Sequence, residues 1–296
     1  MSTTTEAQSH DDRGRGLHAV KVGARRGLRE FRISLRNPED ISFYVFWGVG
    51  IVVYLFLNRR EVIEPVGLTV PQFALAGILA TMVVFGGVVG PAFALVTEKE
   101  DGTLLRAKAA PHGIRGYVTG QVVLQSLGML PMLVIVVIPT AFFADRLMHR
   151  GAVGWFGVAA LLLLGLAAAL PLGIVMGAVA RKPSQVTTWG LLPVFGLSAI
   201  SGVFFPISAM WGWVQGVAQV FPIYWLGHGL RWAFLPDDAA VVEVGGEWRL
   251  LEAIGVLGAW GALGMLLAPR VLRRMARRES GSAVEARRQE RMQRLG

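Results

Sequence analysis

The sequence contains no cysteine, so disulfide bonds, thiolate metal sites and cysteine nucleophiles are all excluded. It also lacks the G-x-x-x-x-G-K-[S/T] loop that cradles nucleotide phosphates and the H-E-x-x-H pair of a zinc site, and its five histidines form no comparable ligand cluster. The G-x-S-x-G turn of serine hydrolases is missing too. We therefore predict no metal site, no bound cofactor and no catalytic residue in this chain.

Charged residues are scarce, at 17% of the chain against 53% hydrophobic residues, and they are missing from six long stretches. A soluble domain of this length carries more charge and fewer apolar residues. A run of about 20 apolar residues is enough for a helix to cross the bilayer core. We therefore expect an all-α membrane protein with six transmembrane helices, predicted at about residues 41–58, 72–96, 117–143, 152–180, 185–203 and 250–269.

The fifth uncharged stretch, residues 183–230, is roughly twice as long as one crossing requires. Its second part is interrupted by Pro206 and Pro222 and is rich in tryptophan and tyrosine, whose rings favour the headgroup layer. We expect residues 204–230 to form a re-entrant or interfacial helical hairpin on the outer side, before the last span, rather than a seventh crossing.

Lysine and arginine are concentrated on one side of the predicted spans. Six crossings with both termini in the cytoplasm place 23 of the 29 basic residues on the inner side, as the positive-inside rule requires. This orientation puts the polar segment 97–116 and the basic tail 270–296 in the cytoplasm and leaves no reason to expect nucleic-acid binding. The first 40 residues lack the apolar core of a secretory signal peptide, so the first span is expected to direct insertion.

An amphipathic pattern precedes the first span. Apolar residues such as Leu28 and Phe31 recur at steps of three and four, whereas arginines such as Arg29 and Arg32 fall off that stripe. The pattern predicts an interfacial helix over residues 17–38, with its arginines near the anionic headgroups of the inner leaflet. Residues 1–16 carry no apolar stripe and are predicted to be disordered.

A charged segment, TEKEDGTLLRAKAAPHGIR, separates the second span from the third. Thr97 and Glu100 have the spacing of a capping box, and the run after Thr103 favours a short helix that Pro111 ends. On spacing alone, a solvated loop whose charges only keep it in water is as good an interpretation as a docking element for a partner.

The predicted spans hold no group that could drive transport by itself. None of the first five contains an ionisable residue, and Glu252 is placed at the outer end of the sixth. Carriers driven by protons or sodium place such a group near mid-membrane, and channels show charge rings or a filter sequence. Energy is therefore expected to arrive through a partner that binds the cytoplasmic loop.

The loop also carries a family signature. Residues 98–106, EKEDGTLLR, followed by Pro111 and Tyr117, resemble the coupling loop of ABC-2 type permeases, the membrane subunits of bacterial ABC exporters. The later SGVFFP, residues 201–206, resembles the segment that follows the fifth span in that family. The resemblance covers most of the chain: the interfacial helix, six spans, the coupling loop and the outer hairpin before the last span.

The resemblance implies that the loop seats in a groove of a separate ATP-binding subunit, which would hold ATP and Mg²⁺. This chain would then be a transporter subunit and not an enzyme. Two permease copies, identical or paralogous, would pair in a bacterial plasma (inner) membrane, and the interfacial helix would also touch the ATPase, with membrane anchoring alone as the alternative. The residues expected to couple the loop to the ATPase are Glu98, Glu100, Asp101, Gly102, Thr103, Leu104, Leu105 and Arg106.

The family arrangement also implies that spans two and five line a central path between two copies. An apolar lining fits a hydrophobic or amphipathic, drug-like or antibiotic-like cargo that is exported, as in multidrug efflux. Export of a lipid, glycolipid or lipid-linked polymer is the alternative within transport. The candidates for the path are Met82, Phe85, Phe93, Phe195, Ser198, Ser201, Phe204 and Phe205.

Two other classes of protein stay open. A membrane sensor or scaffold could bind a drug without moving it. A membrane enzyme acting on lipid would need polar groups that converge at the outer interface, and the residues available there, at no recognised spacing, are His149, Asp145, His228 and Asp237.

Small residues at four-residue spacing, Gly86 with Gly90 and Gly173 with Gly177, predict close helix contacts. The contacts could lie within one subunit or between two. Prolines inside the spans are expected to kink them and to let helices move relative to one another, namely Pro91, Pro131, Pro171 and Pro193.

Overall fold

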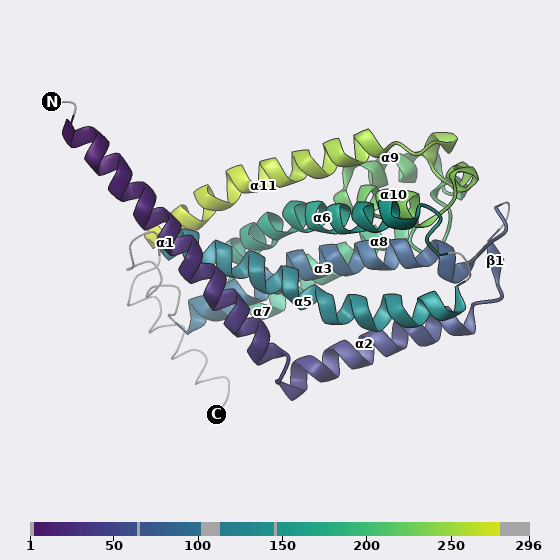
Figure 1. Ribbon diagram of the computed structural model, residues 1–296, viewed down its shortest axis with the longest axis horizontal. Coiled ribbons are helices and arrows are strands. Elements are labelled where there is room, and N and C mark those ends of the chain that lie inside the picture. Colours follow the sequence, from purple (N-terminus) through teal and green to yellow (C-terminus); the bar gives the residue numbers. More distant parts are fainter. Residues whose placement is uncertain (1–2, 64–65, 102–112, 145–146, 279–296) are drawn as a thin grey trace.

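The long apolar stretches form long helices, since a helix satisfies its backbone hydrogen bonds within one segment. The computed structural model describes residues 3–63, 66–101, 113–144 and 147–278, and Figure 1 shows these residues almost entirely as helices, which confirms the expected all-α membrane protein. The elements are α1 (Thr3–Ser34), α2 (Pro38–Leu57), β1 (Val62–Ile63), β2 (Leu68–Thr69), α3 (Val70–Glu100), α5 (Gly113–Phe143), α6 (Gly151–Val179), α7 (Pro183–Val186), the π-helical η1 (Thr187–Leu191), α8 (Leu192–Ile200), η2 (Ile207–Ala209), α9 (Gly212–Val220), α10 (Pro222–Phe234), η3 (Asp237–Val242), η4 (Val244–Gly246) and α11 (Leu250–Arg278).

Among the described residues, five helices are long and apolar enough to cross a membrane: α2, α3, α5, α6 and α11. The predicted fifth span, residues 185–203, corresponds to three short elements, α7, η1 and α8, which follow one another from Pro183 to Ile200. The π-helical turn of η1 and the proline that follows it, Pro193, divide this segment. The count of six spans therefore stays a prediction, and five of the six coincide with single α-helices.

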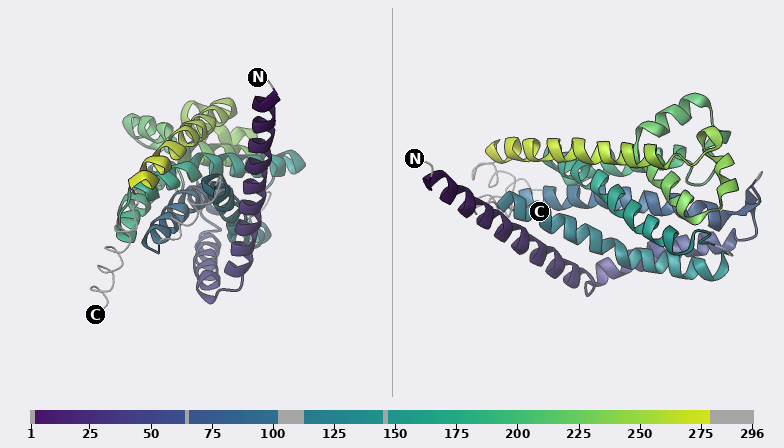
Figure 2. Two further views of the ribbon diagram at one scale, coloured as in Figure 1. Left: turned by 90° about the vertical axis from the view of Figure 1, so that its left-hand side faces the viewer. Right: turned by 45° about the horizontal axis from the view of Figure 1, so that its top comes forward.

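Helix α3 lies at the centre of the bundle. It is mostly buried and packs along α6, whereas α2, α5 and α11 leave most of their apolar residues at least partly exposed. Figure 2 shows α1 crossing the bundle obliquely at one end. We call this end the basic end; it holds α1, the last turns of α3, α6 and α11, and the first turn of α5. The opposite end, with the strands, α9 and α10, is called the hairpin end. Apolar faces exposed along a bundle suit contact with lipid.

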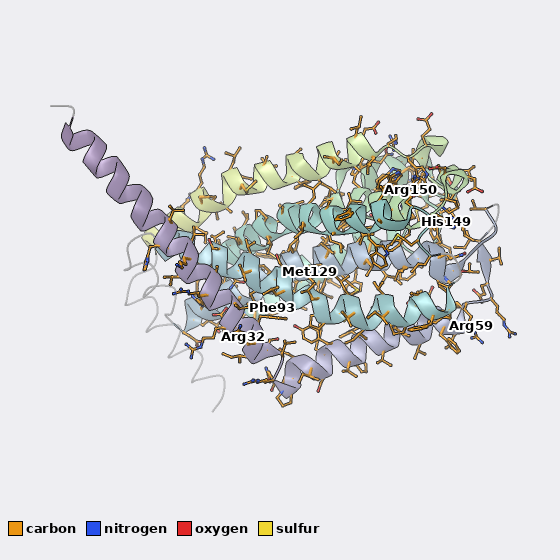
Figure 3. The ribbon with its side chains drawn as sticks, viewed as in Figure 1. Arg32, Arg59, Phe93, Met129, His149 and Arg150 are labelled. Carbon is orange, nitrogen blue, oxygen red and sulfur yellow. The ribbon has the colours of Figure 1, made fainter. Side chains whose placement is uncertain are left out.

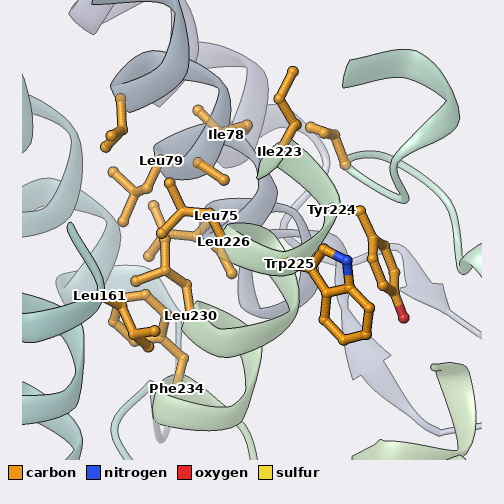
Figure 4. Close-up of a cluster of buried hydrophobic side chains, with 14 of the residues drawn as sticks. Leu75, Ile78, Leu79, Leu161, Ile223, Tyr224, Trp225, Leu226, Leu230 and Phe234 are labelled. Carbon is orange, nitrogen blue, oxygen red and sulfur yellow. The ribbon is translucent and has the colours of Figure 1, made fainter. Parts of the chain in front are cut away.

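The core at the hairpin end is built where α10 enters the bundle. Figure 4 shows its interdigitating side chains: Leu75 and Leu79 of α3, Leu161 of α6, and Leu226 and Leu230 of α10. All five side chains are buried. Because α10 is apolar around almost its whole circumference, it is covered by α3, α6 and α11 and lies inside the protein.

The burial of α10 corrects part of the predicted hairpin, residues 204–230. Trp211 and Trp213, beside and on α9, are exposed, as an interfacial position requires. Tyr224 and Trp225 of α10 are buried instead of facing the headgroup layer. The interfacial alternative is therefore wrong for α10, because a short apolar helix at the interface and one buried in the protein have the same composition. The re-entrant alternative stays a prediction.

Three helix limits also differ from the predicted ones. Helix α1 begins at Thr3, so most of the segment predicted to be disordered continues the helix, since extending a formed helix costs far less than starting one. Helix α3 continues to Glu100, which places Thr97 inside its last turn and not at a new helix start. Helix α11 runs through Pro269 to Arg278, so the first part of the predicted tail is helical. The two-residue strands β1 and β2, paired antiparallel, were not predicted.

Glycines bring α3 and α6 into close contact within one subunit. A Cβ on Gly173 would lie 2.4 Å from the carbonyl oxygen of Val88, and one on Gly177 would lie 2.9 Å from the backbone of Ala92. Gly86 differs, because a Cβ there would meet no atom within 4 Å. Of the two predicted glycine pairs, both members of the pair on α6 pack inside the subunit, as small residues permit. In the pair on α3 only Gly90 does so, since a Cβ there would lie 2.7 Å from Nε2 of Gln125 on α5.

Candidate functional site

The end of α3 is the part of the predicted coupling loop that the structure describes. Glu98 and Glu100 are half-buried, and Asp101 follows as an exposed residue. Helix α5 begins at Gly113. The remaining predicted coupling residues lie outside the described residues: Gly102, Thr103, Leu104, Leu105 and Arg106.

An arginine of α1 joins three helices at this point. Nη2 of Arg26 lies 2.8 Å from Oε1 of Glu98 on α3, and its Nε lies 2.6 Å from Oε1 of Glu30, one turn along α1. The guanidinium also lies 5.9 Å from the ring centroid of Tyr117 on α5. Burial alone would lower the pKa of Arg26, but the two carboxylates raise it above its ordinary value. We call Arg26, Glu30, Glu98 and Tyr117 the Arg26 cluster.

Helix α1 sits on α5 through paired glycines. A Cβ on Gly23 would lie 2.1 Å from the carbonyl oxygen of Gly116, and one on Gly27 would lie 2.4 Å from that of Gly120. Both helices thus carry a G-x-x-x-G pair at their crossing, which lets the two backbones touch. The predicted interfacial helix therefore has a face that packs on protein.

The predicted interfacial residues lie off that protein face. Leu28, Arg29 and Arg32 are exposed, and Phe31 is half-buried. Figure 3 labels Arg32 on α1 near the basic end. One side of α1 therefore packs on α5, while Leu28 and the two arginines are exposed on the rest of the helix.

Replacing Gly27 with leucine is expected to separate α1 from α5 and to cost about 1–3 kcal/mol, as overpacking does. The melting temperature in detergent, followed by tryptophan fluorescence, should fall, and trypsin should cut α1 faster. Gly50→Leu on α2 is the matched control, because a Cβ at Gly50 would meet no atom within 4 Å. Equal melting of the two variants would contradict the close α1–α5 contact.

Lys99, the neighbour of Glu98, closes the end of α6. Its Nζ donates to the carbonyl oxygens of Gly177 at 2.7 Å, Ala180 at 2.6 Å and Ala178 at 3.4 Å. The last carbonyls of a helix have no partner within the helix and form the negative end of its dipole. Leaving a buried carbonyl without a donor costs about 1–3 kcal/mol. Lys99 is 6% exposed, and the sequence prediction did not single it out.

The predicted path residues divide into two groups. Met82 and Phe85 of α3 are partly exposed, and the ring of Phe85 contacts that of Phe195 on α8, with centroids 5.9 Å apart. Phe93, labelled in Figure 3, also lies on α3 and is partly exposed. Phe204 and Phe205 are exposed.

The two serines predicted for the path are buried inside the subunit. Ser198 is 3% exposed and Ser201 is 1% exposed. Oγ of Ser198 donates to the carbonyl oxygen of Val194 at 2.7 Å and accepts from Oγ1 of Thr81 at 3.0 Å. A hydroxyl in an apolar helix is satisfied inside the protein in this way. The two serines therefore do not contribute to the exposed face that holds Phe85 and Phe195.

A buried ionic network holds α10 at the hairpin end. Arg231 of α10 forms an ion pair with Glu243, and its Nη1 donates to the carbonyl oxygen of Gly202 at 3.1 Å. Oη of Tyr224 donates to Oε2 of Glu243 at 3.2 Å. Both charged side chains are 1% exposed. Burial alone would raise the pKa of Glu243, but Arg231 and His228 hold it below its ordinary value, at about 2.

His228 completes this network. Its Nε2 accepts the backbone N–H of Arg249 at 3.0 Å. Its Nδ1 lies 2.9 Å from Oε2 of Glu243. We call Tyr224, His228, Arg231 and Glu243 the α10 network.

The outer polar residues considered for an enzyme do not converge. His228 is enclosed in the α10 network, whereas His149 is exposed. Asp237 forms an ion pair with Arg150, which also stacks on Trp232. Figure 3 labels His149 and Arg150 near the hairpin end. Asp145 lies outside the described residues.

A family model described as ABC-2 type transporter matches residues 29–235, well over half of the chain. The matched range begins in α1, includes the end of α3 and Lys99, and ends just after α10. No curated protein matches the chain.

Proposed function

The chain belongs to the ABC-2 type transporter family, and on that premise we propose that this multi-pass membrane permease is the transmembrane subunit of an exporter. The cargo is a hydrophobic or amphipathic, drug-like compound that moves outward. Permeases of this family work with an ATP-binding partner subunit. In this proposal the partner binds and hydrolyses ATP with Mg²⁺, and the permease itself has no enzymatic activity.

The observation that carries the proposal is the arrangement at the basic end. Glu98, Glu100 and Asp101 end a helix that is tied to α1 through Arg26 and to α6 through Lys99. A force applied at this point reaches several helices at once. The basic end faces the cytoplasm in this proposal, because the positive charges of α1 and the Arg181–Lys182 pair gather there.

An exposed apolar surface on α3 and α8 supports a dimer of permeases. Phe85 and Phe195 meet there, and Leu192 is also exposed. Two copies placed with these surfaces facing each other would enclose a path with an apolar lining. Such a lining favours hydrophobic over charged cargo, because burying an unpaired charge is costly. Both termini lie on the cytoplasmic side of a bacterial inner membrane in this arrangement.

Reversing the charges at the end of α3 is expected to weaken binding of the ATP-binding subunit at this site, which we call the dock. The double variant Glu100→Lys, Asp101→Lys should retain less than about one tenth of the ATP-binding subunit on co-purification, since losing charge pairs at an interface costs about 2–5 kcal/mol. The measurement is the ratio of the two proteins after affinity purification of the permease in mild detergent. A second measurement is ATP-dependent cargo flux in vesicles, which separates export from drug sensing.

The matched control reverses two exposed charges at the hairpin end, Asp238→Lys and Glu247→Lys. It should keep the full amount of ATP-binding subunit. Full retention in the α3 variant would place the dock elsewhere. A native permease that binds no ATP-binding protein would contradict the proposed exporter.

A further inference from the structure

Two neighbouring residues at the end of α3 bind to different helices. Glu98 reaches α1 through Arg26, and Lys99 reaches the end of α6 through backbone carbonyls. We propose that Lys99 is a positioning residue that locks the end of α3 to the end of α6, so that displacement of the loop after α3 is passed to α6. This inference rests on the proposed function, because it assumes that the ATP-binding partner pushes on that loop.

We call the contact of Lys99 with the last carbonyls of α6 the lock. It combines a charge, hydrogen bonds and close helix packing at one place, which makes it rigid. The ammonium group has three N–H donors, and three carbonyl oxygens face it, two in the last turn of α6 and one on Ala180, directly after the helix. One of the three, the carbonyl of Gly177, belongs to the glycine whose Cα faces the backbone of Ala92 on α3. The two helices are therefore fastened and in backbone contact within the same turn of α6. A side chain that is 6% exposed cannot exchange these partners for water without leaving its position.

Helix α6 connects this lock to the hairpin end. At its other end α6 packs on α10: a Cβ on Gly165 would lie 2.4 Å from Leu226, and one on Gly229 would lie 2.9 Å from Leu161. Helix α10 is in turn fixed by its buried Arg231–Glu243 pair. Motion at the end of α3 thus has a continuous packed route through α6 to α10. Coupling between two distant sites requires a structural element whose position is shifted by events at both sites, and α6 contacts both.

The absence of cysteine allows a direct test on the permease alone. Thr97 and Arg181 are both exposed and lie at the ends of α3 and α6, so cysteines introduced there can carry spin labels. In nanodiscs, the distance between the labels should be narrow in the otherwise native chain and broad in Lys99→Met. Lys99→Arg, which keeps a cation and its donors, should restore the narrow distance. An unchanged distance in Lys99→Met would overturn the lock.

The matched control is Lys182→Met. Lys182 lies close to the same end of α6, but its side chain is exposed, so its removal should leave the distance unchanged. Equal broadening in both variants would mean that any lost charge loosens this end, and the role of Lys99 would be refuted. Lys99→Gln, whose amide keeps two donors, should give an intermediate width and serves as the second variant.

The coupling role is tested in the complex with its ATP-binding subunit, reconstituted in proteoliposomes. For Lys99→Met, the amount of cargo moved per ATP hydrolysed should fall by about tenfold, within the usual range of coupling between sites. Co-purification of the ATP-binding subunit should not change, and Lys99→Arg should recover the ratio. A ratio equal to that of the native complex would overturn the inference, and so would loss of the ATP-binding subunit, which would make Lys99 part of the dock.

The two proposals can fail separately. If the native complex hydrolyses ATP and moves no cargo, the exporter proposal fails, and the coupling role of Lys99 fails with it, even where the spin labels show the lock. If the native complex transports and the Lys99→Met ratio is unchanged, the exporter proposal stands and the coupling role is refuted.

Discussion

Replacing Glu243 with alanine is expected to destabilise the protein by about 3–5 kcal/mol, the cost of leaving a buried charge without its partner. Arg231 would keep one backbone acceptor, the carbonyl of Gly202, at a position that is 1% exposed. Tyr224 would lose its acceptor, and His228 would lose its neighbouring carboxylate, at the same time. The free energy of unfolding, measured by denaturant titration in detergent with tryptophan fluorescence, is the observable.

Asp237→Ala is the control for this change. It removes a carboxylate that pairs with an arginine at the same end of the molecule, but the Asp237 side chain is 78% exposed. Exposed ion pairs contribute about 0–1 kcal/mol, so the expected loss is small. The double variant Arg231→Met, Glu243→Leu should recover part of the stability that Glu243→Ala loses, because it removes both buried charges. Equal losses for Glu243→Ala and Asp237→Ala would contradict the role of the α10 network.

The same carboxylate predicts the direction of the pH dependence. Its pKa is about 2 in the folded protein and ordinarily 4.5, so its ionised form contributes stability above pH 4.5. That contribution is lost as the pH falls from 4.5 through 2. Near neutral pH it is constant, and Glu243→Gln should remove the acid-dependent part.

Replacing Gly173 with alanine is expected to cost about 1–3 kcal/mol or to prevent folding, although alanine is the better helix former. The added Cβ would lie 2.4 Å from the carbonyl oxygen of Val88 and 2.7 Å from that of Gly87. Both obstacles are backbone atoms of α3, so the two central helices would have to separate. The measurement is the yield of monodisperse protein in detergent and its melting temperature.

Gly86→Ala is the matched control for Gly173→Ala, and it is expected not to destabilise the protein. It lies on α3, where a Cβ would meet no atom within 4 Å, so alanine should be neutral or stabilise by up to about 1 kcal/mol through helix propensity. If Gly173→Ala melted at the same temperature as Gly86→Ala, the contact of α3 with α6 would be looser than the structure shows.

The spans were predictable because uncharged runs of sufficient length leave few alternatives in a membrane protein. The glycine crossing of α1 and α5 had a readable signal that was missed: Gly23 with Gly27 and Gly116 with Gly120 both have the spacing that favours close helices. An amphipathic stripe does not reveal this crossing, because glycine contributes nothing to such a stripe.

The role of Lys99 had no signal of this kind. Its partners are main-chain carbonyls of α6, about 80 residues further along the chain, and any residue type supplies a carbonyl. The partner of Arg231 was similarly hidden, since Glu243 lies in an irregular segment that sequence patterns leave unassigned. Sequence patterns describe which face of an element is apolar, and they do not describe which distant backbone meets a charge.

The π-helical turn η1 changes the phase of the segment that contains it. An α-helix advances by about 100° per residue, and a π-helical turn accommodates one residue more than an α-helical turn. If the same residues were wound as an α-helix throughout, α8 would be rotated by about 100° relative to α7. Phe195 would then leave the side of α8 that meets Phe85, and buried Ser198 would turn with it. Deleting one residue from Thr187–Leu191 would instead convert the turn to an α-helix and keep the present orientation of α8, so the π-helical turn sets which residues of α8 face out of the subunit.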